Sequence, residues 1–574
     1  MPAGWTPQMR TPLPLILIRG FGGNKVDDER MLAYQGFVDG SVYPHKRGEN
    51  YIYEGFILRL IKSRWRYEDG TNVINYYSKP IKEAVPKDAI SGLGLPKDFF
   101  SGHKIVVDPD MARSFLLKPR KDRRSTFWVF RYYDLEETDF EGYGAALHRL
   151  VGLVQGLVDA KQIRPAQGNV GASPRVADDD SDDKSVAKPS KVNIIAHSMG
   201  GLIVRQAVQV NFGGPKADAA INKVVTLGTP HKGISFQLLR ELGWLRIRAA
   251  DELWQFNPKN QLKKGNPCGF GTFPQAFPLE RLLCVVGTDF RGYSIKISTL
   301  ANRIFSVPGE DALLTYNRSD GLVQQTYAVI DGSPRTYVNK CHGGGDSLMT
   351  ARESFEIATR FFFGDVRVRL YLVNAKVNRR FDRIGRNEFF FGVSIKPRRL
   401  DFELFHQSKQ AENCYGPFRK DDLSDAKPTF DWAGPNRMIW EGCLDKGQRH
   451  DNPDLVLRAE IYVGERDSFG FGFSDNIVFH HQIYVRALFE PFRLEIHKDE
   501  EFQKDSASPQ DGSAMREANG GWEFDVSDPN FGATLRVEFD DIPEIGPPIR
   551  ITPAMINQPT PKPAKQPVLT GAGK

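Results

Sequence analysis

The stretch VNIIAHSMGGLIVR, residues 192–205, decides the fold. It begins as an apolar run typical of a buried strand and ends with the apolar spacing of a helix. A strand that passes into a helix through one tight turn lifts the turn residue, here Ser198, above the edge of a sheet. The turn is strained, so the residues two before and two after it must be small, and they are Ala196 and Gly200. The stretch therefore predicts a serine nucleophile, and the helix beside it offers backbone N–H groups to a developing negative charge.

Short β-rich runs alternate with helical segments on both sides of this stretch, from residue 13 to about 365. This alternation is typical of a mostly parallel sheet flanked by helices. The predicted strands cover residues 15–19, 127–132, 192–196, 223–227 and 282–286, and the predicted helices cover residues 142–161, 200–210 and 347–363. We therefore predict an α/β catalytic domain over residues 1–365.

Three segments interrupt this pattern. Residues from about 26 to 125 form a large insertion rich in aromatic side chains, which we expect to roof the site. Residues 163–190 hold almost no large apolar side chain, so they predict a flexible surface loop. Residues from about 234 to 280 begin with apolar side chains near helical spacing, and these fit an opening lid and a permanent cap helix equally well.

Beyond residue 366 the apolar period changes to two. Val366, Val368 and Leu370 face one way, while Arg367 and Arg369 face the other. Similar runs, separated by turn residues, occur at 388–396, 455–463, 477–488, 492–497 and 533–539. This alternating pattern predicts an antiparallel β-sandwich accessory domain over residues 366–546. The proline-rich stretch at residues 547–574 predicts an extended, disordered tail.

A glycine-rich turn follows the first predicted strand, in LILIRGFGG at residues 15–23. Acyl transfer passes through a tetrahedral oxyanion, which needs hydrogen-bond donors. One donor is expected from the N–H of Met199, directly after the serine, and the other from a loop that follows an early strand. Phe21 is the candidate for this second donor in the oxyanion hole. The glycines around it fit neither a P-loop nor the dinucleotide-binding spacing.

Three motifs together resemble bacterial lipases and related esterases of the α/β-hydrolase fold, including their inositol-deacylase-like branch. They are RGFG at residues 19–22, AHSMGG at 196–201 and VTLGTPHKG at 225–233. The resemblance covers roughly residues 13–364 and implies nothing about the predicted sandwich. Such lipases usually carry His-Gly before the oxyanion residue, whereas this chain carries Arg19-Gly20. Backbone donation stays possible, but the turn has to be held in another way.

The fold that these motifs resemble implies a histidine base late in the chain, with a carboxylate before it. His342 is the candidate base because it precedes the predicted helix that closes the domain. The alternatives are His231, in a motif that resembles a structural feature of lipases, and His197, beside the serine.

The candidate acid is Asp320, in the segment NRSDGLV at residues 317–323. This segment resembles the acid-bearing segment of lipases and completes the order Ser, Asp, His. Asp289 is the alternative acid, since it follows the predicted strand at 282–286, where this fold often places its carboxylate.

Composition and charge indicate the cellular location of the protein and the kinds of site that it holds. The chain has 574 residues, a net charge of +6 and five cysteines without the paired spacing of a zinc or redox motif. Neither a signal peptide nor a membrane-spanning segment is recognised, so we expect a cytoplasmic protein, although export by a signal-independent route stays open. The basic run at residues 118–124 is interpreted as a solvated loop rather than as a contact for anionic surfaces.

The sequence thus predicts a serine hydrolase that cleaves carboxylic esters, with a lipid or another hydrophobic acyl compound as substrate. No cofactor and no metal are expected, and no nucleic-acid partner. Contact with a membrane surface stays open, as does the oligomeric state. An acyltransferase or thioesterase would use the same residues, and a non-catalytic binding scaffold is a further alternative.

Overall fold

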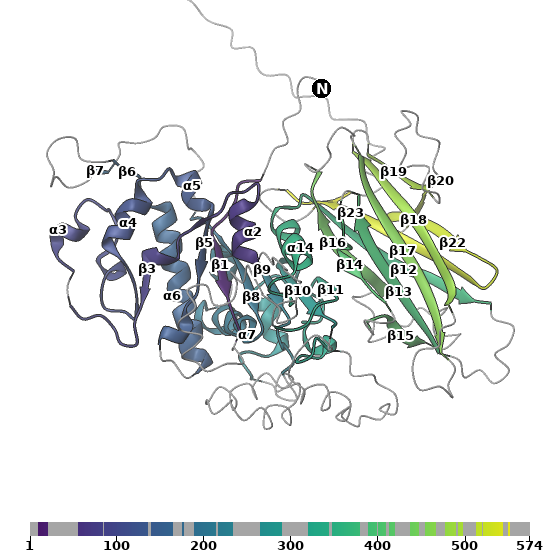
Figure 1. Cartoon of the computed structure of the whole chain (residues 1–574), viewed down its shortest axis with the longest axis horizontal. Coiled ribbons are helices and arrows are strands. Elements are labelled where there is room, and N and C mark those ends of the chain that lie inside the picture. The colour runs from purple at the N-terminus through teal and green to yellow at the C-terminus, as the bar shows by residue number, and fades with distance from the viewer. Residues whose placement is uncertain are drawn as a thin grey trace, which may run out of the picture.

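The structure is a computed structural model in which an α/β part and a β-rich part lie side by side (Figure 1). The residues that it describes are 10–20, 55–83, 85–135, 139–164, 175–176, 189–213, 216–233, 265–289, 319–343, 347–378, 388–398, 400–408, 413–418, 437–446, 454–466, 477–489, 492–497, 513–518, 520–543 and 549–551.

Within these residues, seven strands form one parallel sheet in the order β11-β10-β9-β8-β1-β5-β2. The strands are β1 (Leu15–Ile18), β2 (Glu68–Asp69), β5 (Thr126–Val129), β8 (Val192–His197), β9 (Ile221–Leu227), β10 (Leu282–Gly287) and β11 (Arg335–Val338). The central strands β1, β5, β8 and β10 are buried at every residue, as a sheet covered on both faces requires. The predicted α/β fold class is confirmed.

Helices pack on this sheet (Figure 1). They include α6 (Phe140–Asp159), α7 (Met199–Gln206), which continues into a π-helical turn at Ala207–Asn211, and α14 (Arg352–Phe363). The side chain of Asp139 caps α6 by accepting a hydrogen bond from the N–H of Gly142. The helix predicted at 347–363 is shorter than expected, because residues 348–350 form a turn before α14 begins.

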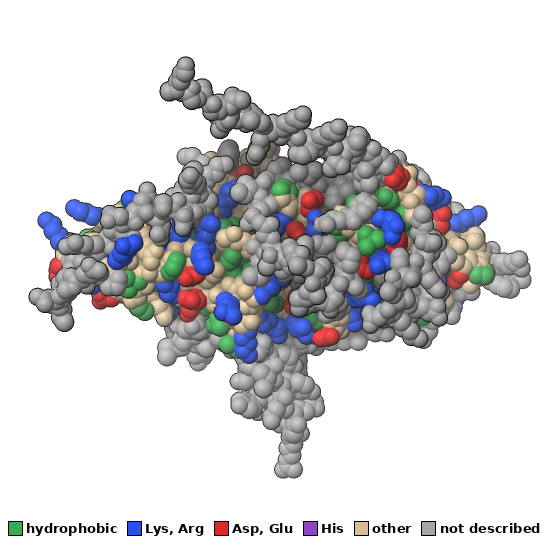
Figure 2. Space-filling model, turned by 90° about the horizontal axis from the view of Figure 1, so that it is seen from above, with side chains coloured by type: hydrophobic (Ala, Val, Ile, Leu, Met, Phe, Trp, Pro, Cys, Tyr) green, Lys and Arg blue, Asp and Glu red, His purple; other side chains and the backbone are tan. Residues whose placement is uncertain are grey.

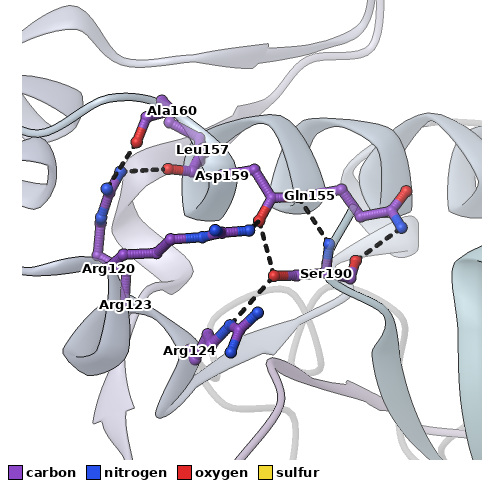
Figure 3. A network of polar contacts seen from close by, with 8 residues as sticks. All are labelled: Arg120, Arg123, Arg124, Gln155, Leu157, Asp159, Ala160 and Ser190. Atoms are coloured by element: carbon purple, nitrogen blue, oxygen red, sulfur yellow. Dashed lines mark hydrogen bonds and ion pairs between the residues drawn. The ribbon is translucent and has the colours of Figure 1, made fainter. Parts of the chain in front are cut away.

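The basic run at 118–124 was predicted to be a solvated loop, and this prediction is wrong in two respects. Residues 120–124 form the short helix α5 (Arg120–Arg124), and Arg123 is buried within it. The Arg123 guanidinium donates to the carbonyl oxygens of Leu157, at 2.8 Å, and Ala160, at 2.6 Å, at the C-terminal end of α6 (Figure 3). A buried arginine thus satisfies carbonyl groups that the end of a helix leaves without partners.

The same network fixes the point at which the chain enters β8. Both carboxylate oxygens of Asp159 accept hydrogen bonds from Ser190, at 2.7 Å each, and Asp159 also pairs with Arg120 at 2.6 Å. Gln155 donates to the carbonyl of Ser190 at 2.8 Å (Figure 3).

The surface charge is mixed. On the described part of the face seen in Figure 2, Lys and Arg side chains lie among Asp and Glu side chains rather than in one basic patch.

The described part of the large insertion builds one edge of the sheet, through β2. It also contributes α2 (Phe56–Lys62), the two-stranded β3 (Ile74–Tyr76) and β4 (Ile105–Val107), and α4 (Pro109–Leu116). Phe56 packs edge-on against Phe355 of α14, and Trp65 stacks on Phe363 of the same helix with ring centroids 4.3 Å apart. These two aromatic side chains therefore cover α14.

The β-rich part consists of two antiparallel sheets, as predicted. In the described residues one sheet has the order β16-β12-β23-β22-β21, with β24 on β23, and the other has the order β14-β13-β17-β18-β19-β20, with β15 on β13. The longer strands are β12 (Val366–Val377), β13 (Glu388–Pro397), β16 (Met438–Leu444), β17 (Asp454–Arg466), β18 (Ile477–Phe489), β19 (Phe492–His497), β22 (Gly521–Ser527) and β23 (Phe531–Asp541). The shorter ones are β14 (Phe405–His406), β15 (Tyr415–Phe418), β20 (Ser513–Ala514) and β21 (Arg516–Ala518).

Three residues of the tail predicted from residue 547 belong to a strand. Residues Ile549–Ile551 form β24, which pairs antiparallel with the end of β23, because Phe539 to Asp541 offer an open strand edge there. The predicted loop at 163–190 likewise contains a short ladder between β6 (Ile163–Arg164) and β7 (Arg175–Val176). Apart from residues 189 and 190, which lead into β8, the remainder of both segments lies outside the described residues.

Two further observations concern the cysteines and the length of the apolar helices. All five cysteines fall within the described residues, where they are buried and no disulfide joins them. No helix in the described ranges is long and apolar enough to cross a membrane.

Candidate active site

Ser198 lies where β8 passes directly into α7. Its backbone has φ of 53° and ψ of −128°, a region that a non-glycine residue occupies only at a cost of about 1–3 kcal/mol. The Ser198 N–H donates to the carbonyl of Leu227 on β9 at 2.9 Å, and its own carbonyl accepts from Gly201 in the first turn of α7, at 3.0 Å. The neighbouring strand and the helix thus hold the strained turn, and Ser198 stands at the carboxyl end of the sheet.

The turn of Ser198 is packed against the end of β1. A Cβ atom placed on Gly200 would lie 2.7 Å from the carbonyl oxygen of Ile18, and one on Gly20 would lie 2.3 Å from the Cβ of Ser198. Real Cβ atoms do not approach other atoms so closely. The expectation that Gly200 must be small is therefore explained by the approach of the β1 backbone.

The structure brings Ser198, His342 and Asp320 into one hydrogen-bonded chain. The Nε2 atom of His342 lies 2.9 Å from the hydroxyl oxygen of Ser198, and its Nδ1 atom lies 2.8 Å from Oδ2 of Asp320. All three residues are buried. The second carboxylate oxygen, Oδ1, accepts from the backbone N–H groups of Leu322 at 3.0 Å and Val323 at 2.8 Å. Since a carboxylate only accepts, Nδ1 of His342 carries the proton and Nε2 is left to accept from the serine hydroxyl.

Asp320 and His342 are also joined through their backbones. The His342 N–H donates to the Asp320 carbonyl at 2.8 Å. Both residues lie beyond the carboxyl ends of β10 and β11, and a Cβ placed on Gly287, the last residue of β10, would lie 2.6 Å from the Cβ of Asp320. The candidate acid and the candidate base thus lie at the ends of these strands.

The alternative residues occupy other places. The backbone N–H of Asp289 donates to the carbonyl of Lys340 at 3.2 Å, while Asp320 takes the position beside Nδ1 of His342. His231 is fully buried, and its Nε2 lies 3.1 Å from the Thr226 hydroxyl on β9. The Nε2 of His197 lies 2.8 Å from the carbonyl oxygen of His342. The structure therefore brings neither alternative histidine to the hydroxyl of Ser198.

Of the two proposed oxyanion donors, Met199 is the first residue of α7 and is buried. Phe21 lies outside the described residues, as does the apolar beginning of the lid or cap segment, residues 234–264. Among the described side chains, no group of three or more His, Cys, Asp or Glu residues is arranged to hold a metal ion.

A pair of tyrosines holds the Arg19-Gly20 turn, and the sequence did not reveal it. Tyr132 donates to the carbonyl of Arg19 at 3.1 Å, and Tyr133 donates to the carbonyl of Gly20 at 2.6 Å. The two rings stack with centroids 4.2 Å apart, and burial raises the pKa of Tyr132 well above its ordinary value, which keeps it a donor. Two adjacent tyrosines just after β5, the strand beside β1, were the signal available in the sequence.

We expect Gly20→Ala to lower kcat for an ester substrate about 100-fold, because the new methyl group would displace the turn from Ser198 by a sizeable fraction of an ångström. Steady-state kinetics per folded molecule measures this effect. Gly152→Ala on α6 is the matched control, since a Cβ there meets no atom within 4 Å. Equal activities of the two variants would contradict the tight contact.

A comparison with protein families supports the resemblance. Residues 126–262 match the PGAP1-like alpha/beta domain. The matched segment starts at β5 and includes β8, the Ser198 turn and α7. The family resemblance predicted from the sequence is thus confirmed for this segment. A comparison with curated proteins gives no match.

Several solved structures are also similar to the chain, at low sequence identity. The product of a Listeria innocua gene shares 13% identity, covering 61% of this chain and 94% of its own, with a TM-score of 0.26. The mature form of a Bacillus licheniformis lipase shares 13% identity, covering 51% of this chain and 99% of its own, with a TM-score of 0.27. A phospholipase from Legionella pneumophila shares 10% identity, covering 78% of this chain and 98% of its own, with a TM-score of 0.25.

Proposed function

We propose that this protein is a serine hydrolase that cleaves carboxylic esters through an acyl-enzyme on Ser198. The observation that carries the proposal is the hydrogen-bonded chain from the Ser198 hydroxyl through His342 to Asp320. A nucleophile within hydrogen-bond reach of a base, which is itself oriented by a third group, is the arrangement that activates a serine hydroxyl. The strained turn that presents Ser198 supports the same role.

In the proposed reaction, His342 Nε2 takes the hydroxyl proton as Ser198 Oγ attacks the carbonyl carbon of the ester. Asp320 keeps the Nδ1–H tautomer of His342 and stabilises the imidazolium that forms. The N–H groups of Met199 and Phe21 are proposed to hold the oxyanion. The proton on His342 then passes to the leaving alcohol, and water, activated by the same histidine, releases the acid and restores Ser198.

The substrate proposed is an ester with a hydrophobic acyl group, such as a lipid. This part of the proposal is supported by the three motifs that resemble lipases and related esterases, and by the family match across the Ser198 turn. The fold alone does not specify a substrate, so the acyl group has to be found by direct assay.

The proposal is tested by labelling the full chain with a fluorophosphonate probe and locating the adduct by peptide mass spectrometry. We expect one adduct, on Ser198, because phosphonylation requires an activated serine. In parallel, p-nitrophenyl esters of increasing chain length should be hydrolysed, with the medium and long chains preferred. Absence of both the adduct and ester hydrolysis would refute the hydrolase. Product formation only with an added alcohol, amine or thiol acceptor would instead favour an acyltransferase.

A further inference from the structure

His197, the residue before the proposed nucleophile, contacts the proposed base through the backbone. Its Nε2 lies 2.8 Å from the carbonyl oxygen of His342, and the two imidazole rings lie with centroids 4.8 Å apart. His197 is buried at the end of β8. It therefore makes a specific polar contact between the strand that delivers the nucleophile and the loop that delivers the base.

The chemistry of this contact fixes the state of His197. A carbonyl oxygen only accepts, so Nε2 must carry the proton. Burial lowers the pKa of His197 well below its ordinary value, which keeps the ring neutral and leaves Nδ1 without a proton. The Nδ1 atom is buried and has no hydrogen-bond partner among the described residues. Among the described residues, the polar contact of the His197 side chain is therefore the one with the His342 carbonyl.

Four hydrogen bonds then orient His342 relative to Ser198. Its N–H donates to the carbonyl of Asp320, and its Nδ1–H donates to the Asp320 carboxylate. Its carbonyl accepts from His197, and its Nε2 accepts from the Ser198 hydroxyl. Since residues 197 and 198 are neighbours in the chain, at the end of β8 and in the turn after it, they hold His342 at two points, one on its backbone and one on its ring. Without the hydrogen bond from His197 to the His342 carbonyl, only the hydrogen bonds to Asp320 would fix where the His342 ring lies relative to Ser198.

We propose that His197 is a positioning residue, whose neutral imidazole donates to the His342 carbonyl and holds the base at attacking distance from Ser198. This inference rests on the proposed serine hydrolase and adds a residue to its machinery. His197 does not touch the reacting atoms. Its effect is on the fraction of molecules in which His342 is placed to take the proton, so the expected change lies in kcat rather than in KM.

A matched pair of substitutions tests the proposal in the full-length protein. His197→Met removes the donor, whereas His197→Gln has a similar length and keeps an N–H at the end of the side chain. With a p-nitrophenyl ester, kcat of the methionine variant is expected to fall about 30-fold to 100-fold at nearly unchanged KM. Losses of about this size are common when a residue that orients a functional side chain is replaced. The glutamine variant is expected to regain at least half of that loss on a logarithmic scale.

His231→Met is the control for the loss of a buried histidine, because His231 is also fully buried and bonds to Thr226 rather than to the site. Its kcat per folded molecule should match that of the wild type, even if the melting temperature falls. His197→Asn is the second test variant, since its amide is too short to reach the carbonyl. If the methionine variant does not fold, the asparagine variant decides, with the same loss of kcat expected.

The proposal would be overturned by equal kcat values for the methionine and glutamine variants, or by a loss at His231 as large as that at His197. These outcomes differ from failure of the hydrolase itself. In that case the wild-type protein would neither hydrolyse the ester nor react with a fluorophosphonate. A wild type that does both, beside a fully active His197→Met variant, would refute only the positioning role.

Discussion

Ser198→Ala is expected to lower kcat for p-nitrophenyl esters by at least about 10⁴-fold, down to the background of the assay. The reason is that the hydroxyl oxygen, 2.9 Å from His342 Nε2, is the atom that forms the acyl-enzyme, and no other atom replaces it. Stopped assays at high enzyme concentration measure the residual rate. The variant should also lose fluorophosphonate labelling completely.

The fold should survive this substitution, because alanine keeps the Cβ contact with the Gly20 turn and removes one oxygen. The melting temperature is therefore expected to stay within a few degrees of the wild-type value. Ser354→Ala is the matched control, since Ser354 on α14 is buried and its hydroxyl has no hydrogen-bond partner in the part of the chain that the structure describes. Hydrolysis retained by Ser198→Ala, or lost equally in Ser354→Ala, would reject Ser198 as the nucleophile.

The core of the candidate site was predictable because its signals are local. The stretch at 192–205 carries the strand, the turn and the helix in consecutive residues, and the structure follows it closely. The order of Ser198, Asp320 and His342 along the chain follows from the order in which parallel strands deliver their carboxyl ends. The hydrogen bonds among them had to be seen in three dimensions.

The supporting contacts were not predictable, because they join segments far apart in sequence. His197 bonds to a residue 145 positions away, and Tyr133 to one 113 positions away. These contacts follow from the strand order β11-β10-β9-β8-β1-β5, which no single stretch encodes. A histidine beside a serine, and two tyrosines after a strand, are by themselves ordinary features of a buried core.

Edge elements were missed for a different physical reason. The strand β2 has only the two residues Glu68 and Asp69, and it lacks the apolar run by which a central strand is recognised. The strand β24 lies among prolines, yet its backbone completes the ladder of β23. Arg123 looked solvated because charge normally stays in water, but its five donors suit the carbonyl groups at the end of α6.

Asp320→Asn is the second substitution with a very large expected effect, about 10⁴-fold on kcat. The carboxylate uses Oδ1 for the N–H groups of Leu322 and Val323, so the amide oxygen of asparagine should take that position. The amide NH₂ would then face Nδ1 of His342, where Oδ2 now lies 2.8 Å away. A donor at this place forces Nδ1 to accept, which moves the ring proton to Nε2.

A His342 protonated at Nε2 donates to Ser198 and cannot take its proton, so the variant should bind the ester with nearly unchanged KM and fail in the chemical step. Asp289→Asn, the same change at the other candidate acid, is expected to keep kcat within about twofold, because Asp320 occupies the position beside Nδ1. Steady-state kinetics of both variants, each with its melting temperature, separates the two carboxylates. A loss of kcat in Asp289→Asn with full activity in Asp320→Asn would transfer the role of the acid to the residue after β10, which would then have to fix the tautomer of His342.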